Sequence, residues 1–233
     1  MLSHRVAGSG VLLAAICSLS LGCVATPPAS PSPPAVGAKD EEAGFTPLFN
    51  GKDLSGWVGD TTGYIVENGA IVCGPQGRNL YTEREYGNFV LRLEFQLTPG
   101  ANNGIGIRTP REGDPAYVGM ELQVLDNTAE KYRELKSYQY HGSIYGVVAA
   151  KREFLKPVGE WNEQEIRVDG RRVRITLNGT VIVDADLDEV TRGGTIDGQA
   201  HPGLARTTGH IAFCGHGDRV AYRKLRLREL PGS

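Results

Sequence analysis

The stretch Phe89-Val-Leu-Arg-Leu-Glu-Phe-Gln-Leu97 decides the fold, because every second side chain in it is large and apolar. Successive side chains of a β-strand point to opposite faces, so a period of two places all five apolar side chains on one face. The other face carries Val90, Arg92, Glu94 and Gln96. The pattern predicts a long strand over 89–97 with one face in a hydrophobic core.

The same period of two returns further along the chain. It is found at Ile166 and Val168, and again in the stretch 173–177. Asp169-Gly170 lies between these two stretches and Asn178-Gly179 follows the second. Both dipeptides favour tight hairpin turns because their residues tolerate positive φ. We therefore expect a three-stranded antiparallel meander over 161–184, and a last pair of strands over 209–214 and 219–230.

No window from Gly44 onward holds a long apolar stripe with the period of a helix. The 233 residues include 31 Gly and 13 Pro, which suits a protein rich in turns. Many short strands separated by Gly-rich turns predict a single all-β domain, built as a two-sheet antiparallel β-sandwich. The segments 127–143 and 184–208 are expected to be long loops, which are common places for a binding site. The net charge of -2 provides no basic surface of the kind that binds nucleic acid.

The N-terminal part of the chain has the composition of a targeting segment. An apolar run over 11–21 is too short to span a bilayer and ends in Ser20-Leu21-Gly22-Cys23, which resembles a bacterial lipoprotein box. We expect a signal peptide over 1–22, lipidation of Cys23, a Pro-rich tether over 23–43 and a folded domain over 44–233. The alternative is an ordinary secretory signal cleaved nearby.

Lipidation would place the protein in the bacterial cell envelope, at the outer membrane or the periplasmic face, attached to the membrane through the lipid anchor only. Without it the protein would be secreted. In either compartment a disulfide between Cys73 and Cys214 is permitted, and the alternative is two buried thiols that pack as small hydrophobes.

Two neighbouring predicted strands, over 103–109 and 118–126, carry polar side chains opposite their apolar faces. If the apolar faces point into the sandwich, Arg108, Glu121 and Gln123 lie together on the outer surface of one sheet, beside Gly104 and Gly106. A guanidinium, a carboxylate and an amide on a surface bared by glycines are suited to bind sugar hydroxyls. The competing interpretation is an ordinary solvated sheet face with an Arg–Glu pair.

Several longer motifs together resemble those of one known family. They begin with Phe45-Thr-Pro-Leu-Phe-Asn-Gly-Lys-Asp-Leu-Ser-Gly-Trp57. They continue with Glu121-Leu-Gln-Val-Leu-Asp126, Gly142-Ser-Ile-Tyr145, Lys156-Pro-Val-Gly-Glu-Trp-Asn162, Leu177-Asn-Gly179, His201-Pro-Gly203 and Gly209-His-Ile-Ala-Phe-Cys-Gly-His-Gly-Asp218. The chain resembles the 3-keto-disaccharide hydrolase domain family over nearly all of 45–230.

The resemblance implies a concanavalin A-like sandwich, or jelly roll, that acts on 3-keto-glycosides. Gly146 stands where relatives often carry Asp, and Cys214-Gly215-His216 replaces a Gln-Asp-His run. A ketone at sugar C3 acidifies the proton on C2, so that a base can remove it and the group at C1 can leave before water adds. This route needs a base, a stabiliser for the enolate oxygen and an acid for the leaving group.

We expect Glu121 to act as the base, Arg108 to stabilise the enolate oxygen, and His141 or His216 to be the acid. The residues expected to bind the sugar are Gln123, Asp126, Tyr145 and Asn103. No metal or other cofactor is identified, although a divalent cation held by Asp126 or Glu121 could replace Arg108. The alternatives are a non-catalytic carbohydrate-binding module, a structural envelope domain without ligand, and a conventional glycosidase with two carboxylates. The oligomeric state is left open.

Overall fold

The computed structural model describes residues 42–232. The expected signal peptide, Cys23 and almost all of the tether lie outside these residues. In the part of the chain that is described, no helix is long and apolar enough to cross a membrane.

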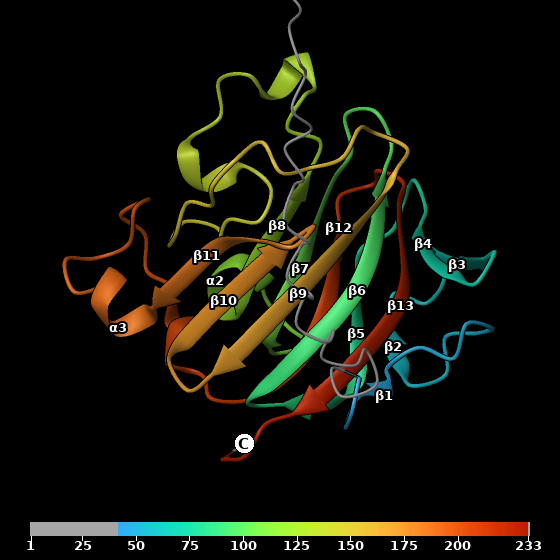
Figure 1. Ribbon diagram of the computed structural model, residues 1–233, viewed down its shortest axis with the longest axis horizontal. Coiled ribbons are helices and arrows are strands. Elements are labelled where there is room, and N and C mark those ends of the chain that lie inside the picture. The colour runs from blue at the N-terminus through green and yellow to red at the C-terminus, as the bar shows by residue number, and fades with distance from the viewer. Residues whose placement is uncertain (1–41, 233) are drawn as a thin grey trace, which may run out of the picture. The chain divides into compact units, whose positions relative to one another are not determined.

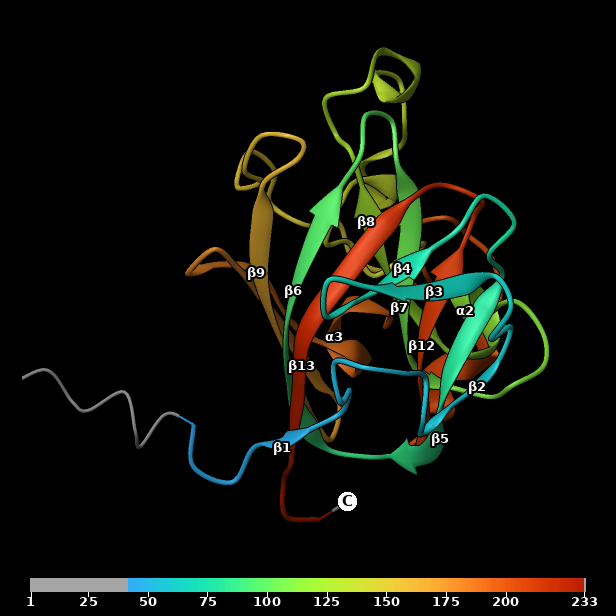
Figure 2. The same ribbon diagram turned by 90° about the vertical axis from the view of Figure 1, so that its right-hand side faces the viewer.

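Two antiparallel sheets form the molecule, and Figure 2 shows them edge-on as two layers. The larger sheet has eight strands in the order β11-β10-β9-β6-β13-β4-β3, with β1 paired to β13. Its strands are β1 (Thr46–Pro47), β3 (Tyr64–Glu67), β4 (Ala70–Cys73), β6 (Phe89–Leu97), β9 (Trp161–Asp169), β10 (Arg172–Leu177), β11 (Thr180–Asp186) and β13 (Val220–Glu229). It faces the viewer in Figure 1.

The smaller sheet has five strands in the order β2-β5-β12-β7-β8. Its strands are β2 (Trp57–Gly59), β5 (Asn79–Tyr86), β7 (Asn102–Thr109), β8 (Met120–Leu125) and β12 (Gly209–Gly215). Helical segments are short and lie in the connections, at α2 (Pro115–Val118), η1 (Glu130–Tyr132), η2 (Ser137–Gln139), α3 (Leu187–Val190) and η3 (Pro202–Ala205). The chain is therefore the all-β two-sheet sandwich that its period-two patterns predict.

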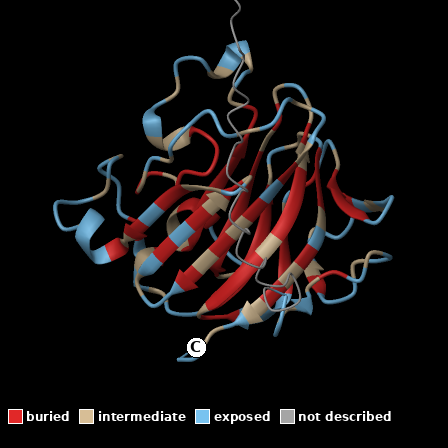
Figure 3. Cartoon of the chain, viewed as in Figure 1, coloured by how far each residue is buried: buried red, intermediate tan, exposed pale blue. Residues whose placement is uncertain are grey.

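The strand β6 buries one face in the core, as the alternation of apolar residues in 89–97 predicts. All five odd-numbered side chains of β6 lie in the core between the sheets, and Figure 3 shows the alternation of buried and exposed residues most clearly in β9 and β10. Three aromatic rings join the two sheets at the centre. Phe213 stacks on Tyr222 with ring centroids 3.8 Å apart and on Trp57 at 5.1 Å. Burial of each such side chain contributes about 1.5–3 kcal/mol.

The predicted meander is present with the predicted turns. β9 pairs with β10 and β10 with β11 on either side of the two dipeptides, with one shift of register between β10 and β11 at Ile175–Thr176. Asn178 and Gly179 both have positive φ, 49° and 82°, which is the backbone that a two-residue hairpin turn matching the twist of its strands requires.

Candidate functional site

The candidate site lies on the outer face of the five-stranded sheet, over β7 and β8. Ile105 and Ile107 of β7 are fully buried in the core, so Asn102, Gly104 and Gly106 face outward. The neighbouring strand β8 pairs with β7 so that Gly104 lies opposite Gln123 and Gly106 opposite Glu121. The glycines form a strip without side chains beside two polar residues, as the sequence predicts, but Glu121 and Gln123 are buried there, each 5% exposed.

Glu121 lies flat across this strip. A Cβ atom added to Gly104 would lie 1.9 Å from Oε1 of Glu121 and 2.6 Å from its Cγ and Cδ atoms. Any other residue at position 104 would therefore displace the carboxylate. Oε1 is buried, and no group within residues 42–232 forms a hydrogen bond with it. A buried carboxylate oxygen without a donor is costly, which makes Glu121 suited to accept a proton or a hydrogen bond from a ligand.

His216 faces Glu121 from the turn that follows β12. Its Nε2 atom is 3.5 Å from Oε1 of Glu121, and about half of its side chain is exposed. Contact with the Glu121 carboxylate raises the pKa of the His216 imidazole, against the opposite effect of partial burial. The pair therefore places a carboxylate next to an imidazole whose protonated form it stabilises, and these are two groups that general acid–base catalysis can use.

Hydrogen-bond donors for a ligand surround this pair. Gln123 donates from Nε2 to Oδ1 of Asn102 at 2.6 Å. The hydroxyl of Tyr145 accepts from Nε2 of Gln139 at 3.1 Å, so its own proton is left to donate. Together these groups line a cleft of about 220 Å³. Its lining is Asn102, Asp114, Ala116, Tyr117, Glu121, Gln123, Leu125, Tyr132, Leu135, Gln139, Tyr145 and His216.

The structure thus brings together Glu121, Gln123, Tyr145 and His216 from the predicted set. The cleft also contains polar and aromatic residues that the sequence pattern does not predict. Asn102 could have been found, because it shares its parity with Gly104 and Gly106. Asp114 and Tyr117 on α2, and Tyr132 and Gln139 in the loop after β8, carry no periodic signal that would assign them to the cleft.

The expectation that Arg108 lies beside Glu121 is wrong. Arg108 has a positive φ of 50°, and β12 shifts its register against β7 between His210 and Ala212. This bulge breaks the alternation that the prediction assumed. The Arg108 side chain is fully buried, and its guanidinium donates to Gly87 O, Asn88 Oδ1 and Arg206 O at 3.0–3.3 Å. It ties loops together and does not line the cleft.

His141 is also in a different place from the one expected. Its ring lies inside the sandwich against Phe95, with ring centroids 4.9 Å apart, and Nε2 is 3.1 Å from Oε1 of Gln164. Only 2% of the residue is exposed. Because the core separates it from the outer face, His141 cannot reach a ligand in the cleft, and of the two histidines expected as the acid only His216 lines it.

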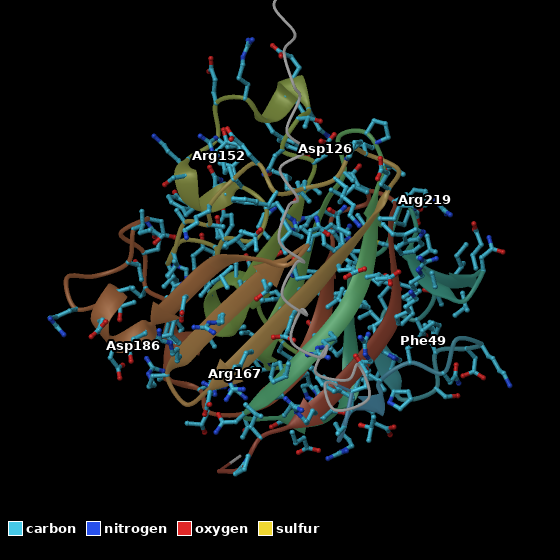
Figure 4. The ribbon with its side chains drawn as sticks, in the orientation of Figure 1. Phe49, Asp126, Arg152, Arg167, Asp186 and Arg219 are labelled. Carbon is cyan, nitrogen blue, oxygen red and sulfur yellow. The ribbon has the colours of Figure 1, made fainter. Side chains whose placement is uncertain are left out.

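Asp126 and Asn103, which were expected to bind the sugar, form hydrogen bonds within the protein. Asp126 accepts from Gly100 N at 2.8 Å and from Thr128 Oγ1 at 2.6 Å, so it closes the turns at the end of β8, where Figure 4 labels it among the loops. Asn103 points inward, and its Oδ1 accepts from the Tyr222 hydroxyl at 2.7 Å. Its parity with Ile105 places it inside the sandwich. Neither residue lines the cleft.

Cys73 and Cys214 are both free and buried, so the disulfide that the sequence permits is not formed. Cys214 belongs to the outer face of the five-stranded sheet, where it packs with Tyr81 and Ala212. Cys73 belongs to the core. Across residues 42–232, no group of three or more His, Cys, Asp or Glu side chains could hold a metal ion.

The loop after α3 supports two walls of the cleft. The ring of His201 packs on Tyr117, with ring centroids 4.9 Å apart, and its Nδ1 donates to Ala116 O at 3.0 Å. Its Nε2 lies 3.0 Å from Oδ2 of Asp197. A Cβ atom on Gly146, next to the cleft residue Tyr145, would lie 2.3 Å from that same oxygen. Gly146 therefore leaves the space that the Asp197 carboxylate and the His201 ring occupy.

Because His141 is buried, we expect the protein to lose stability in acid. Burial lowers its pKa from 6.5 to about 4. The folded protein therefore binds the proton more weakly than the unfolded chain does. The contribution of neutral His141 to the free energy of unfolding is fully present above pH 6.5. It is lost as the pH falls from 6.5 towards 4, by about 3 kcal/mol in total. Denaturant unfolding at pH 7 and pH 4.5 measures this loss.

The His141→Gln variant isolates this contribution, because its amide nitrogen can still donate to Gln164 but does not titrate. We expect the variant to lose less stability between pH 7 and 4.5 than the wild type. An equal loss in both proteins would show that other groups, such as carboxylates, cause the acid sensitivity.

The fold and the site together define a class of protein. The outer face of a concanavalin-like sandwich carries a small polar cleft in which a carboxylate faces an imidazole, as suits a carbohydrate-active domain. Residues 44–228 match the family described as 3-keto-alpha-glucoside-1,2-lyase-like domain, and the chain belongs to that family.

Two relatives with stated activities are similar over most of the chain. A 3-keto-disaccharide hydrolase of Bacteroides thetaiotaomicron is 25% identical over 228 residues, covering 80% of this chain and 79% of the relative. A crystal structure from Parabacteroides distasonis, of a protein provisionally described as a glycosyl hydrolase, is 27% identical with a TM-score of 0.71, and covers 80% of this chain and 99% of its own. A Bacillus subtilis protein with a galectin-like fold has a TM-score of 0.53 at 13% identity, covers 79% of this chain and 94% of its own, and shows the fold alone.

Proposed function

We propose that this protein cleaves 3-keto-glycosides by elimination followed by hydration, with Glu121 as the base and His216 as the acid. The observation that carries the proposal is the Glu121 carboxylate, held across Gly104, whose buried oxygen accepts no hydrogen bond within residues 42–232 and lies 3.5 Å from Nε2 of His216. Membership in the family and the similarity to a 3-keto-disaccharide hydrolase support the substrate class.

In the elimination, Glu121 takes the proton from C2, and the electrons of the C2–H bond form the enolate with the C3 oxygen. The enolate then restores the C3 ketone, forms a C1–C2 double bond and breaks the bond from C1 to the leaving oxygen. His216 gives its proton to that oxygen. The products are an alcohol and a 2-hydroxy-3-keto-glycal. Hydroxyl and amide groups of Tyr145 and Gln123 supply hydrogen bonds to the sugar and its enolate oxygen.

Hydration runs the same exchange in reverse with water as the nucleophile. Neutral His216 takes a proton from water while the oxygen attacks C1, and protonated Glu121 returns its proton to C2. The sum of both steps is hydrolysis, and each residue regains its starting state. The raised pKa of His216 supports this cycle, because it keeps the imidazolium available as an acid.

The test is to incubate the purified protein with a 3-keto-glucoside and with the same glucoside unoxidised, with and without a chelator. We expect product from the 3-keto-glucoside only, together with the ultraviolet absorbance of the unsaturated ketone during turnover. Retention of intact glycan without product would support a non-catalytic binding module in its place. Cleavage of the unoxidised glucoside would support a mechanism with two carboxylates, for which the cleft offers Glu121 and Asp114.

A further inference from the structure

A second hollow adjoins the cleft at His216. It has a volume of about 280 Å³ and is lined by Pro75, Gln76, Gly77, Arg78, His216 and Gly217. His216 is common to the linings of both hollows. The imidazole therefore stands at the boundary between a space that contains Glu121 and a space that contains Arg78.

The backbone around this second hollow is held firmly. Arg78 donates its amide to Oδ2 of Asp60 at 2.8 Å, and its carbonyl accepts from the Tyr64 hydroxyl at 2.9 Å and from Gly215 N at 3.0 Å. A Cβ atom on Gly215 would lie 2.4 Å from Gly77 O, so the turn that carries His216 fits against the 75–78 loop only with glycine. The backbone positions of Arg78 and of the turn that carries His216 are therefore set in advance of binding.

The Arg78 side chain has no partner in the described part of the protein. It is exposed, and its guanidinium forms neither an ion pair nor a hydrogen bond with any group in residues 42–232. By contrast, Arg172 and Arg174 on the outer face of the larger sheet both bind Asp184. A guanidinium offers five N–H donors, and the neighbouring Gln76 offers an amide, so this hollow is suited to a ligand rich in hydroxyl oxygens.

We propose that the second hollow is the subsite for the leaving group, and that it accepts a second sugar. This inference rests on the proposed function. The acid that protonates the glycosidic oxygen must lie between the two halves of the substrate. With the 3-keto sugar beside Glu121 and the oxygen at His216, the leaving sugar extends over Gln76 and Arg78. The protein is thereby selective for disaccharides over glycosides of simple alcohols.

The experiment compares a 3-keto-disaccharide with methyl 3-keto-glucoside of the same anomeric linkage, in the wild type and in Arg78→Ala. Loss of one or two hydrogen bonds to the leaving sugar should lower kcat/KM for the disaccharide about tenfold, mostly through KM, and should leave the methyl glycoside unchanged. Gln76→Ala should give a smaller change of the same kind. Arg192→Ala is the matched control, because Arg192 is exposed and lines neither hollow.

The outcomes separate the two proposals. An unchanged kcat/KM for the disaccharide in Arg78→Ala, or an equal fall for both substrates, would overturn the subsite while the proposed function stands. A wild-type protein that cleaves neither substrate would overturn the proposed function and the subsite with it. Because the Arg78 side chain is exposed, the variant should keep the unfolding midpoint of the wild type, which a denaturant titration checks.

Discussion

Replacing Glu121 with Gln should lower kcat/KM for a 3-keto-glucoside by about 10²–10⁴, the usual contribution of a general base. Gln keeps the size and shape of the side chain and can still lie across Gly104, but it cannot accept the C2 proton. We expect the loss mainly in kcat, since the hydrogen bonds that hold the sugar come from other residues of the cleft. Initial rates with one 3-keto-glucoside, together with exchange of its C2 hydrogen for deuterium in heavy water, measure the effect.

Glu85→Gln is the matched control. Glu85 also faces a histidine, with Oε1 at 3.6 Å from Nε2 of His210, but it does not line the cleft. The same change of charge next to a histidine should therefore leave turnover within about twofold of the wild type, as expected for a substitution outside the reacting groups. If Glu121→Gln keeps both turnover and C2 exchange, Glu121 is not the base.

Replacing His216 with Asn should have an effect that depends on the leaving group. A sugar alkoxide leaves poorly without a proton, so we expect a fall of about 10²–10⁴ in kcat for a 3-keto-disaccharide. An aryl leaving group departs as a stable phenolate, so the same variant should retain most of the rate of phenolate release in the first turnover of an aryl 3-keto-glucoside, while hydration, which also uses His216, should be slowed. Rates on the two substrates measure this difference, and an equal fall on both would rule out His216 as the acid.

The pH profile gives a second measurement of the same pair. Because contact with Glu121 raises the pKa of His216, the imidazolium persists to higher pH than that of an ordinary histidine. Wild-type kcat/KM for the disaccharide should decline as the pH rises through this raised pKa. In Glu121→Gln the carboxylate charge is gone, so the residual activity should decline at lower pH. An unchanged position of the decline would contradict the coupling of the two groups.

A large part of the fold is predictable from local patterns. The strands over 89–97 and 161–184 were predicted from the alternation of apolar residues and from Asp-Gly and Asn-Gly turns, and the structure confirms them. These signals are readable because strand side chains alternate strictly and because few residues tolerate positive φ. The same alternation assigns Glu121 and Gln123 correctly to the outer face beside Gly104, but both residues are buried there, each only 5% exposed, where an exposed surface is expected.

The errors in the site arose where a non-local contact overrides the local period. The bulge in β7 opposite β12 turns Arg108 away from the cleft, and no residue type in 103–109 predicts that bulge. His141 was separated from the cleft by the depth of the core, which depends on how the loop after β8 folds back along β8 at the edge of the smaller sheet and brings His141 against Gln164. The 3.5 Å approach of His216 to Glu121 joins residues 95 positions apart, and sequence spacing contains no such distance.

By itself, then, the sequence determined the sandwich, the apolar and polar faces of its strands and the family, because each depends on side-chain period, turn chemistry or a linear motif. Tertiary structure alone decided which of the two histidines contacts Glu121. It also decided that Arg108 forms hydrogen bonds within the loops and that Arg78 lines the hollow next to the cleft. These facts depend on strand order and on a shift of register between strands distant in the chain, and such pairings are set by the packing of the whole core.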